Sequence, residues 1–347
     1  MIKLIYIPII LLLFSCTKEE LGPQCISCTV EETNTQQADI IIVNEGNFGW
    51  GNGSLTLYNP LDKTISQNIF SQANNNLPLG DVAQSITQLN NKAYIVVNNS
   101  NKVEVVDINS FNSLATITGF TSPRYFLPIN NNKAYVTDLY SNSIQVVDLN
   151  SNTISGNIQL SGWSEELLIH NDSVYVCDMT NDNLLIIDPL NNTLVDSVKV
   201  GESPNSILID QNNKIWIMCS GGINSNLPKL IKFNPQNRTI ENTFTFSSIS
   251  ESPGSLKINA LKNQLYFLNS SVYKMNINDL TLPISTFIMN NNNTFYGLDI
   301  DPINEEVYVS DAIDYVQNGI IFRYSSSGDL INQFNSGVIP GSFLFIE

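Results

Sequence analysis

A short phrase repeats along the chain and constrains its fold more than any other feature. Asn-Lys-Ala-Tyr occurs at 91–94 and again at 132–135, and a third copy reads Asn-Lys-Ile-Trp at 213–216. With looser copies included, the aromatic residue returns every 40 to 50 residues, at Tyr94, Tyr135, Tyr175, Trp216, Tyr266 and Tyr308. A fixed period of this length, built from short strands, indicates an array of repeated units.

Each period contains four short runs of β-branched and aromatic residues, bounded by Asn, Gly, Ser and Asp. The second run of the period, which usually carries the repeated aromatic residue, occurs seven times, from 39–43 to 307–310. The third run also occurs seven times. A fourth run follows the third after a turn, as at 64–70 and 239–246. The run that opens each period appears at 82–89, 124–129, 165–169, 205–209, 255–258 and 295–300.

The seventh opening run lies at the far end of the chain, where 340–346 repeats the pattern of 253–258. The C-terminal strand is therefore expected to complete the first unit and remove an open sheet edge. We predict an all-β fold: a seven-bladed β-propeller of four-stranded antiparallel blades over residues 39–347. Twenty-eight strands and no segment of helical period are expected.

The N-terminal residues are typical of a targeting signal. Lys3 precedes an apolar run at 4–14 that is too short to span a bilayer. Leu13-Phe14-Ser15-Cys16 resembles the lipobox of bacterial lipoproteins, which implies a signal peptide at 1–15, lipidation of Cys16 and a lipidated flexible tether at 16–38. Lys18-Glu19-Glu20 resembles the export signal of Bacteroidetes surface lipoproteins. This implies a lipid-anchored protein of the outer membrane, exposed at the cell surface; an ordinary solvated linker is the alternative.

Charge and cysteine content narrow the function classes. A net charge of −16 with only 16 Lys and Arg argues against a nucleic-acid partner. Cys25 and Cys28 form a C-x-x-C pair without a second pair or a nearby His, which favours a local disulfide in an oxidising envelope over a zinc site. Cys177 and Cys219 lie in strand-like runs, and we expect them to be small buried residues.

One face of the predicted propeller carries the longer loops. These loops join the outer run of one blade to the next blade, or the second run to the third, at 44–53, 71–81, 220–228, 247–254, 290–294 and 311–318. Loops held by a rigid scaffold are common binding sites. Aromatic residues that can stack on a ligand lie in or beside this set: Phe48, Trp50, Tyr125, Tyr140, Trp163, Tyr296 and Tyr315. The alternative is that some of them cap the core.

Acidic residues offer weaker candidates. Asp138, Asp178 and Asp311 end second runs, where they either hold a cation such as a structural Ca²⁺ or cap the following turn. Glu165 and Glu166 are either an acid–base pair or a solvated pair at the start of a strand. His170, the only histidine, is placed at a turn on the opposite face. No histidine-based catalytic set is possible, so we predict no catalytic residues and a protein that is not an enzyme.

Two resemblances add to this interpretation. Ala134-Tyr135-Val136-Thr137-Asp138 and Ser143-Ile144-Gln145-Val146-Val147-Asp148 resemble YVTN-type (YncE-like) propellers. The segment 42–48, Ile-Val-Asn-Glu-Gly-Asn-Phe, followed by 54–58, is similar to the opening of Bacteroidetes propeller lipoproteins. That group includes BtuG-type proteins, which capture cobalamin for a TonB-dependent transporter.

The lipid anchor, the aromatic face and the missing catalytic set favour a non-catalytic surface lipoprotein that captures a small nutrient ligand or partner for a TonB-dependent transporter of the outer membrane. The resemblance implies cobalamin or another corrinoid as the ligand. Two alternatives stay open. One is a metal-assisted lactonase or lyase that uses Asp138, Asp178 and Asp311. The other is an adhesion or scaffold module that binds proteins.

Overall fold

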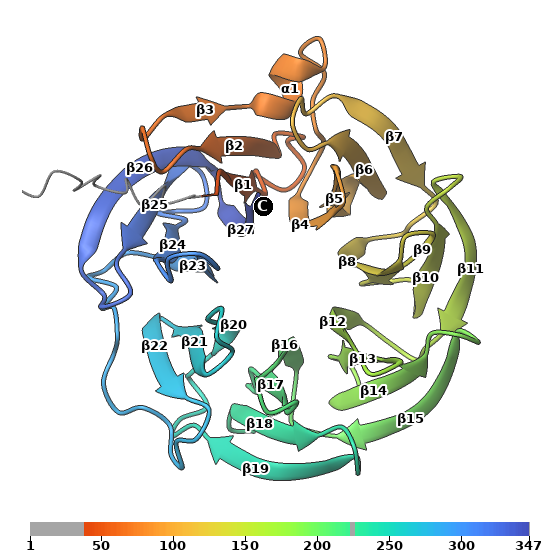
Figure 1. Cartoon of the computed structure of the whole chain (residues 1–347), viewed down its shortest axis with the longest axis vertical. Helices are drawn as coiled ribbons and strands as arrows, with labels where there is room; N and C mark the ends of the chain where they lie inside the picture. Colours follow the sequence, from red (N-terminus) through yellow and green to blue (C-terminus); the bar gives the residue numbers. More distant parts are fainter. Residues whose placement is uncertain (1–37, 223–225, 347) are drawn as a thin grey trace, which may run out of the picture. The chain divides into compact units, whose positions relative to one another are not determined.

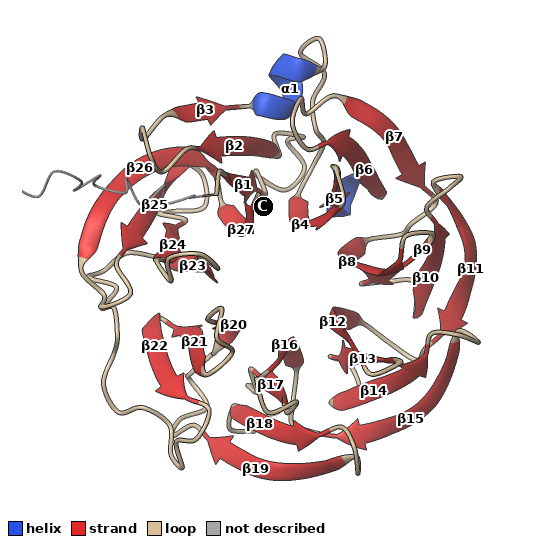
Figure 2. Cartoon of the chain, in the orientation of Figure 1, coloured by secondary structure: helices blue, strands red, loops and turns tan. Residues whose placement is uncertain are grey.

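Seven small sheets surround a central axis in the computed structural model, which describes residues 38–222 and 226–346 (Figure 1). The strands of each sheet lie one beyond another outward from the axis, and almost no helix is present (Figure 2). The predicted all-β seven-bladed propeller is therefore confirmed. The proposed signal peptide, the lipidation site Cys16 and the Cys25–Cys28 pair lie outside the described residues.

In each blade the strand nearest the axis pairs antiparallel with the second strand of the same blade. The inner strands are β27 (Pro340–Phe345), β4 (Ala83–Leu89), β8 (Pro123–Asn130), β12 (Ser164–His170), β16 (Pro204–Ile209), β20 (Gly254–Ile258) and β23 (Phe295–Ile300). The second strands are β1 (Ile40–Asn44), β5 (Lys92–Val97), β9 (Lys133–Asp138), β13 (Ser173–Asp178), β17 (Ile215–Cys219), β21 (Gln264–Asn269) and β24 (Val307–Asp311).

Third and outer strands complete the blades. The third strands are β2 (Ser54–Tyr58), β6 (Lys102–Asp107), β10 (Ser143–Asp148), β14 (Asn183–Asp188), β18 (Lys229–Asn234), β22 (Ser271–Asn276) and β25 (Asn318–Tyr324). The outer strands are β3 (Ile65–Gln67), β7 (Ser113–Thr118), β11 (Thr153–Gln159), β15 (Thr193–Lys199), β19 (Thr239–Thr245) and β26 (Leu330–Val338).

The two ends of the ring meet in the first blade. Strand β27 pairs antiparallel with β1, with Leu344 opposite Ile41 and Phe343 opposite Ile42, and the strand order of this sheet is β27-β1-β2-β3. The predicted closure by the C-terminal strand is confirmed. It covers the inner edge of β1, which would otherwise be an unpaired strand edge.

Two blades depart from the predicted four equal strands. In the first blade the run at 64–70 is not one strand: β3 has three residues, and the helix α1 (Ile69–Ala73) follows it and buries Ile69 and Phe70. In the sixth blade the described residues form no outer strand, and one isolated bridge joins Val272 to Ile288. A short 3₁₀ helix, η1 (Asn98–Ser100), was not expected either.

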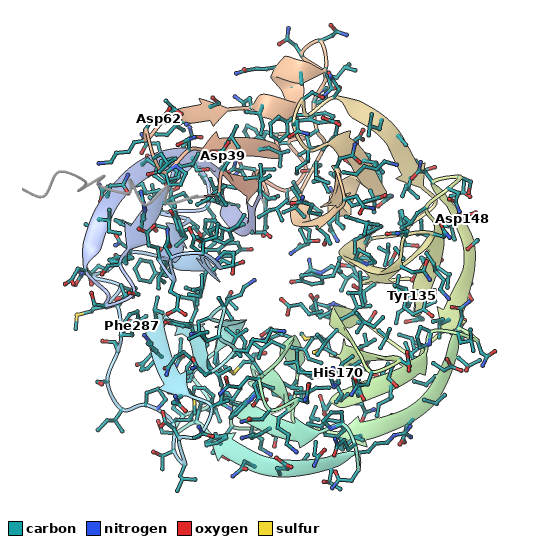
Figure 3. All side chains as sticks on the ribbon, viewed as in Figure 1. Asp39, Asp62, Tyr135, Asp148, His170 and Phe287 are labelled. Carbon is teal, nitrogen blue, oxygen red and sulfur yellow. The ribbon has the colours of Figure 1, made fainter. Side chains whose placement is uncertain are left out.

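The core lies between neighbouring blades, and the repeated aromatic residues build it. All six are nearly or fully buried, and Tyr94 stacks on Phe126 of the next blade with ring centroids 4.3 Å apart. Tyr135 lies among the second strands, whereas Asp148 lies near the outer rim (Figure 3). Cys177 and Cys219 are free and fully buried, as predicted. No helix in the described part of the chain is long and apolar enough to cross a membrane.

Candidate functional site

Every inner strand carries an irregularity close to its start. In all seven blades the pairing register between the inner and the second strand shifts within the first four residues of the inner strand. Such a β-bulge leaves a residue out of the ladder and redirects its side chain. The inner strands all begin at the same end of the axis, so the seven bulges gather there.

In each blade, one residue of the inner strand pairs with the repeated aromatic residue, or with Ile41 in the first blade. We call the residue three places before this inner-strand residue the mouth position. The residues at this position differ from blade to blade: Gln84, Arg124, Glu165, Asn205, Gly254, Tyr296 and Gly341. Most of them are polar or aromatic. The repeat thus places one variable ring of side chains at the start of the inner strands.

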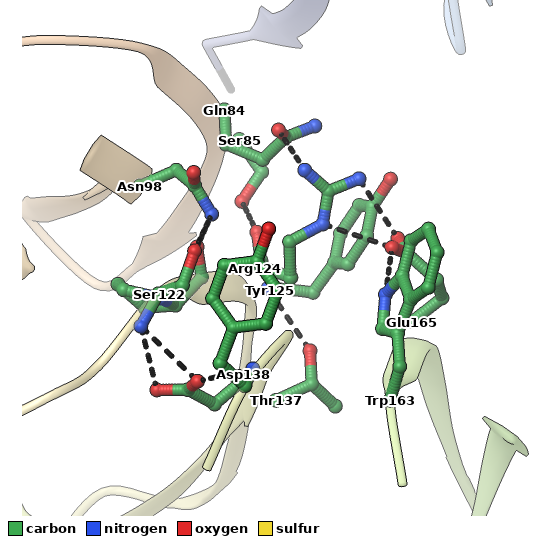
Figure 4. A network of polar contacts seen from close by, with 12 residues as sticks. Gln84, Ser85, Asn98, Ser122, Arg124, Tyr125, Thr137, Asp138, Trp163 and Glu165 are labelled. Carbon is green, nitrogen blue, oxygen red and sulfur yellow. Dashed lines mark hydrogen bonds and ion pairs between the residues drawn. The ribbon is translucent and has the colours of Figure 1, made fainter. Parts of the chain in front are cut away.

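Arg124 joins the mouth positions of three blades (Figure 4). Its Nε and Nη2 atoms donate to the two carboxylate oxygens of Glu165 at 2.9 and 3.2 Å, and its Nη1 donates to Gln84 Oε1. Glu165 is 3 % exposed and also accepts a hydrogen bond from the indole N–H of Trp163. This bidentate geometry fixes both side chains. Burial alone would lower the pKa of Arg124, but the charge of Glu165 raises it.

Glu45 and Tyr296 form a second polar pair where the seventh blade meets the first. The Tyr296 hydroxyl donates to Glu45 Oε1 at 2.9 Å. A Cβ atom at Gly341 would lie 2.8 Å from the same oxygen, so a larger residue at this mouth position would displace the Glu45 carboxylate. Burial raises the pKa of Glu45 to about 7, against the opposing effects of the Tyr296 hydrogen bond and the charge of Arg124.

A third group lies further along the inner strands. Lys257 Nζ and Asp299 Oδ2 form an ion pair at 3.1 Å, and both residues pair with repeated aromatic residues. Glu166 follows a mouth position, and its Oε2 accepts the backbone N–H of Ile207 at 3.1 Å. Burial raises the pKa of Glu166 to about 7, although the charge of Lys257 lowers it.

These groups contain more acids than bases. Arg124 pairs with Glu165 and Lys257 pairs with Asp299, so each cation has its own carboxylate. Glu45 and Glu166 accept hydrogen bonds from neutral donors instead, and their pKa values lie near 7. At neutral pH these two carboxyl groups therefore exchange protons readily and can accept hydrogen bonds from a donor-rich ligand.

An exposed aromatic loop lies next to Glu45. Phe48 and Trp50, 76 % and 79 % exposed, follow Glu45 in a turn that Asn47 ties to the seventh blade by donating to the Tyr315 carbonyl at 2.6 Å. Tyr315 in turn packs edge to face on Tyr296, with ring centroids 5.9 Å apart. The loop with Phe48 and Trp50 is thereby connected through Tyr315 and Tyr296 to Glu45.

The other predicted aromatic residues fall into two groups. Tyr125 and Trp163 belong to the Arg124 network: the Arg124 guanidinium lies 6.0 Å from the Tyr125 ring centroid, and burial raises the pKa of Tyr125 well above its usual value. Tyr140 is 70 % exposed and has no ring contact with another predicted residue in the described chain. The structure therefore brings together Tyr296 and Tyr315, and separately Tyr125 and Trp163, but leaves Tyr140 apart.

The three candidate metal ligands bind backbone groups of their own blades. Asp138 accepts the N–H groups of Thr121, Ser122, Tyr140 and Ser141. Asp178 accepts that of Asn181, and Asp311 accepts those of Thr294 and Ile313. This is the turn capping that formed the alternative to a cation site. Within residues 38–222 and 226–346, no group of three or more His, Cys, Asp or Glu side chains is arranged to hold a metal ion.

One expectation was wrong and several residues were missed. Glu165 and Glu166 are not a solvated pair: at the bulge at the start of β12, Glu165 is buried, and Glu166 is half-buried and accepts the N–H of Ile207. Gln84, Arg124, Glu45, Lys257 and Asp299 were not predicted as site residues. The sequence held a signal for two of them: Gln84 and Arg124 lie two places before Ile86 and Phe126. Glu165 and Asn205 stand in the same relation to Leu167 and Ile207 in the next two blades.

Known structures share the fold at low sequence identity. A quinoprotein alcohol dehydrogenase-like protein from Bacteroides thetaiotaomicron superimposes with a TM-score of 0.71 at 15 % identity, over 90 % of this chain and 79 % of that one. A putative 6-phosphogluconolactonase from Bacteroides fragilis gives 0.67 at 14 % identity, over 91 % and 99 %. A Lactobacillus plantarum protein gives 0.67 at 15 %, over 90 % and 100 %. At such identities the likeness shows the fold alone.

No curated protein matches this chain in sequence. A family model does match it, over residues 39–345, which is nearly the whole propeller. The chain therefore belongs to the family described as "Domain of unknown function (DUF5074)".

Proposed function

We propose that the protein is a non-catalytic binding module that holds a small ligand at the mouth positions and the adjoining aromatic loop. One observation carries this proposal: two large aromatic side chains, Phe48 and Trp50, stay exposed on a loop that is tied to the half-buried acid Glu45 through Tyr315 and Tyr296. Exposed aromatic residues next to convergent polar groups are typical of binding sites.

The chemistry of the residues limits the ligand class. The aromatic rings offer flat apolar surfaces, while Glu45 and Glu166 offer oxygen acceptors and Arg124 offers a fixed guanidinium. A ligand that suits them has a planar apolar part and several hydrogen-bond donors and acceptors. A corrinoid such as cobalamin meets this description and is the ligand that the sequence resemblance implies.

The proposal includes a location and a partner. A lipid on Cys16 would anchor the protein at the outer membrane, and a TonB-dependent transporter would receive the ligand. Both rest on sequence resemblance: the Leu13-Phe14-Ser15-Cys16 segment for the lipid and the 42–48 segment for the partner. Co-purification of the protein with such a transporter from its own membrane tests the second point.

Titration calorimetry of the purified protein with cobalamin, other corrinoids and siderophores tests ligand capture. We expect saturable binding of one class, weakened at least about tenfold by Trp50→Ala or Phe48→Ala, because a buried aromatic contact contributes about 1.4 kcal/mol or more. Leu190→Ala is a matched control: Leu190 is 84 % exposed but lies in a turn between a third and an outer strand, at the opposite end of the propeller. Failure of every ligand class to bind would overturn the proposal.

A catalytic role has one specific observation in its favour. The pKa values of Glu45 and Glu166 lie near 7, where a carboxyl group can give or take a proton. The two functions differ in the fate of the ligand. A bound ligand recovered unchanged after long incubation supports capture, whereas turnover abolished by Glu166→Gln supports catalysis. A ligand-independent complex with another protein would instead support the adhesion or scaffold alternative.

A further inference from the structure

The sixth blade differs from the other six because it lacks an outer strand. Residues 277–288 take the place of that strand, and among the described residues they pair with β22 only at the bridge between Val272 and Ile288. Pro283 lies in this segment and cannot donate a ladder hydrogen bond. A cavity of about 400 Å³ remains between β19 of the fifth blade and β21 and β22 of the sixth. We call it the blade-six cavity.

Aromatic rings form one wall of the blade-six cavity. Phe267 stacks on Tyr273 with ring centroids 5.6 Å apart, and Phe246 meets Phe267 edge to face at 5.9 Å. Leu282 and Pro283 of the replacing segment line the cavity as well. Stacked rings facing aliphatic side chains make a slot that suits a flat apolar group.

A carboxylate lies at the polar end of the cavity. Glu251 Oε2 accepts the backbone N–H of Ser248 at 2.8 Å, and Oε1 accepts the amide of Asn269 at 3.1 Å. These bonds fix the carboxylate, which still has acceptor capacity left. No Lys or Arg of residues 38–222 and 226–346 forms an ion pair with Glu251. A ligand that carries a cation would supply the missing partner.

The segment that replaces the outer strand also exposes apolar side chains. Ile284, which lines the cavity, and Leu280 are 102 % and 85 % exposed, the highest values among the large hydrophobic residues of the described chain. Covering an apolar ligand with these side chains would be favourable, because each Å² of apolar surface removed from water contributes about 25 cal/mol of free energy.

We propose that the blade-six cavity binds a small amphipathic cation, a flat apolar ring that bears an amine. The ring lies against Phe246, Phe267 and Tyr273, and the ammonium faces Glu251. This site does not depend on the proposed function: its residues come from β19, β21, β22 and the segments that follow β19 and β22, and none of them is a mouth position or belongs to the loop with Phe48 and Trp50.

Three indole probes test the ligand class by titration calorimetry on the full-length protein: tryptamine, neutral 3-methylindole and anionic indole-3-acetate. We expect tryptamine to bind with a dissociation constant below about 1 mM, as its size allows. We expect 3-methylindole to bind about tenfold more weakly and indole-3-acetate more weakly still. Equal affinity for all three probes, or no saturation by tryptamine, would overturn the proposal.

Two variants locate the binding. Glu251→Gln keeps an oxygen for the Ser248 N–H but loses the charge, and it should weaken tryptamine about tenfold while leaving 3-methylindole unchanged. Thr245→Trp fills the cavity from the exposed side of β19 and should abolish binding of both probes. Thr243→Trp, two residues earlier on the same face of the same strand, is the matched control and should bind normally. If Trp50→Ala rather than Thr245→Trp removes tryptamine binding, the probe lies at the aromatic loop and the cavity is not its site.

Discussion

Two neighbouring positions of each blade differ in how far their side chains repeat around the propeller. On the second strands, six blades have an aromatic residue at the same place, and every one of them is nearly or fully buried. On the inner strands, the mouth position three residues before the paired site holds Gln, Arg, Glu, Asn, Gly, Tyr and Gly. The backbone repeats at both places, but the side chains repeat at only one.

The difference separates the residues that hold the blades together from the residues that the propeller offers to a ligand. The buried aromatic residues pack between blades, where a repeated contact must have a repeated shape. The mouth positions lie beside a bulge, where the side chain leaves the ladder and meets its neighbours from other blades. Substitution of a repeated aromatic residue should therefore lower the free energy of unfolding, whereas substitution in the exposed aromatic loop should lower ligand affinity instead.

The largest expected effect on stability is at the repeated aromatic position. Trp216 is fully buried, donates its N–H to Asp210 at 2.9 Å and stacks on Phe244. Trp216→Ala should lower the free energy of unfolding by about 3–5 kcal/mol, because it leaves a cavity and removes the donor to one buried oxygen of Asp210. Urea denaturation followed by far-UV circular dichroism measures this, and Trp216→Phe should lose less. A loss below about 1 kcal/mol would show that the position does not hold the blades together.

The Arg124 network should come second. Arg124→Ala leaves the buried Glu165 without its cation, and we expect a loss of about 2–3 kcal/mol, because 19 % of the Arg124 side chain remains exposed. The double variant with Glu165→Ala should be more stable than Arg124→Ala alone, since no unpaired charge remains. Additive losses in a double-mutant cycle by urea denaturation would contradict the coupling.

Titration of Glu45 and Glu166 should have a smaller effect. Folding raises the pKa of each from 4.5 to about 7, so the folded state binds more protons than the unfolded state between these values. The free energy of unfolding should therefore fall as pH rises from about 4.5 to 7.

The variants Glu45→Gln and Glu166→Gln should each remove part of that fall and gain about 1–3 kcal/mol over the wild type at pH 8. Thermal unfolding from pH 5 to 8 measures the difference. The expectation fails if the wild type and both variants show parallel pH profiles.

The smallest effect on stability should be at the exposed loop. Trp50 is 79 % exposed, so Trp50→Ala should change the free energy of unfolding by less than about 0.5 kcal/mol. The same variant is expected to weaken ligand binding at least about tenfold, as proposed above. A large loss of stability in Trp50→Ala would contradict the expected difference between Trp50 and Trp216 and would show that Trp50 contributes to packing.

The sequence predicts the blade number and the closure of the propeller better than it predicts the contacts at the mouth positions. The period of the aromatic residue and the displaced strand at 340–346 were enough for the blade number and the closure, because both depend on repetition. Arg124 escaped prediction, and Glu165 was left between an acid–base role and solvent, because strict alternation assigns a strand's first polar residues to solvent. A bulge reverses that assignment, and apart from the polar residue that recurs ahead of the apolar run, nothing local in the sequence marks it.

The departures in the first and sixth blades have the same origin. The helix α1 has only five residues, too few to show a helical period. In the sixth blade Pro283 interrupts the segment where an outer strand was expected. Both changes lie at the rim, where a blade can lose an outer strand without opening the ring.

Closure by β27 sets the order in which the molecule can be completed. Leu344 pairs with Ile41, which precedes it by some 300 residues, so β1 waits for its inner partner until nearly all other blades have been synthesised. Joining such distant segments costs chain entropy and slows folding. Glu45 directly follows β1 and Gly341 belongs to β27, so the region around Glu45 is assembled last. A nascent or truncated chain could therefore contain most of the blades and still lack a working mouth.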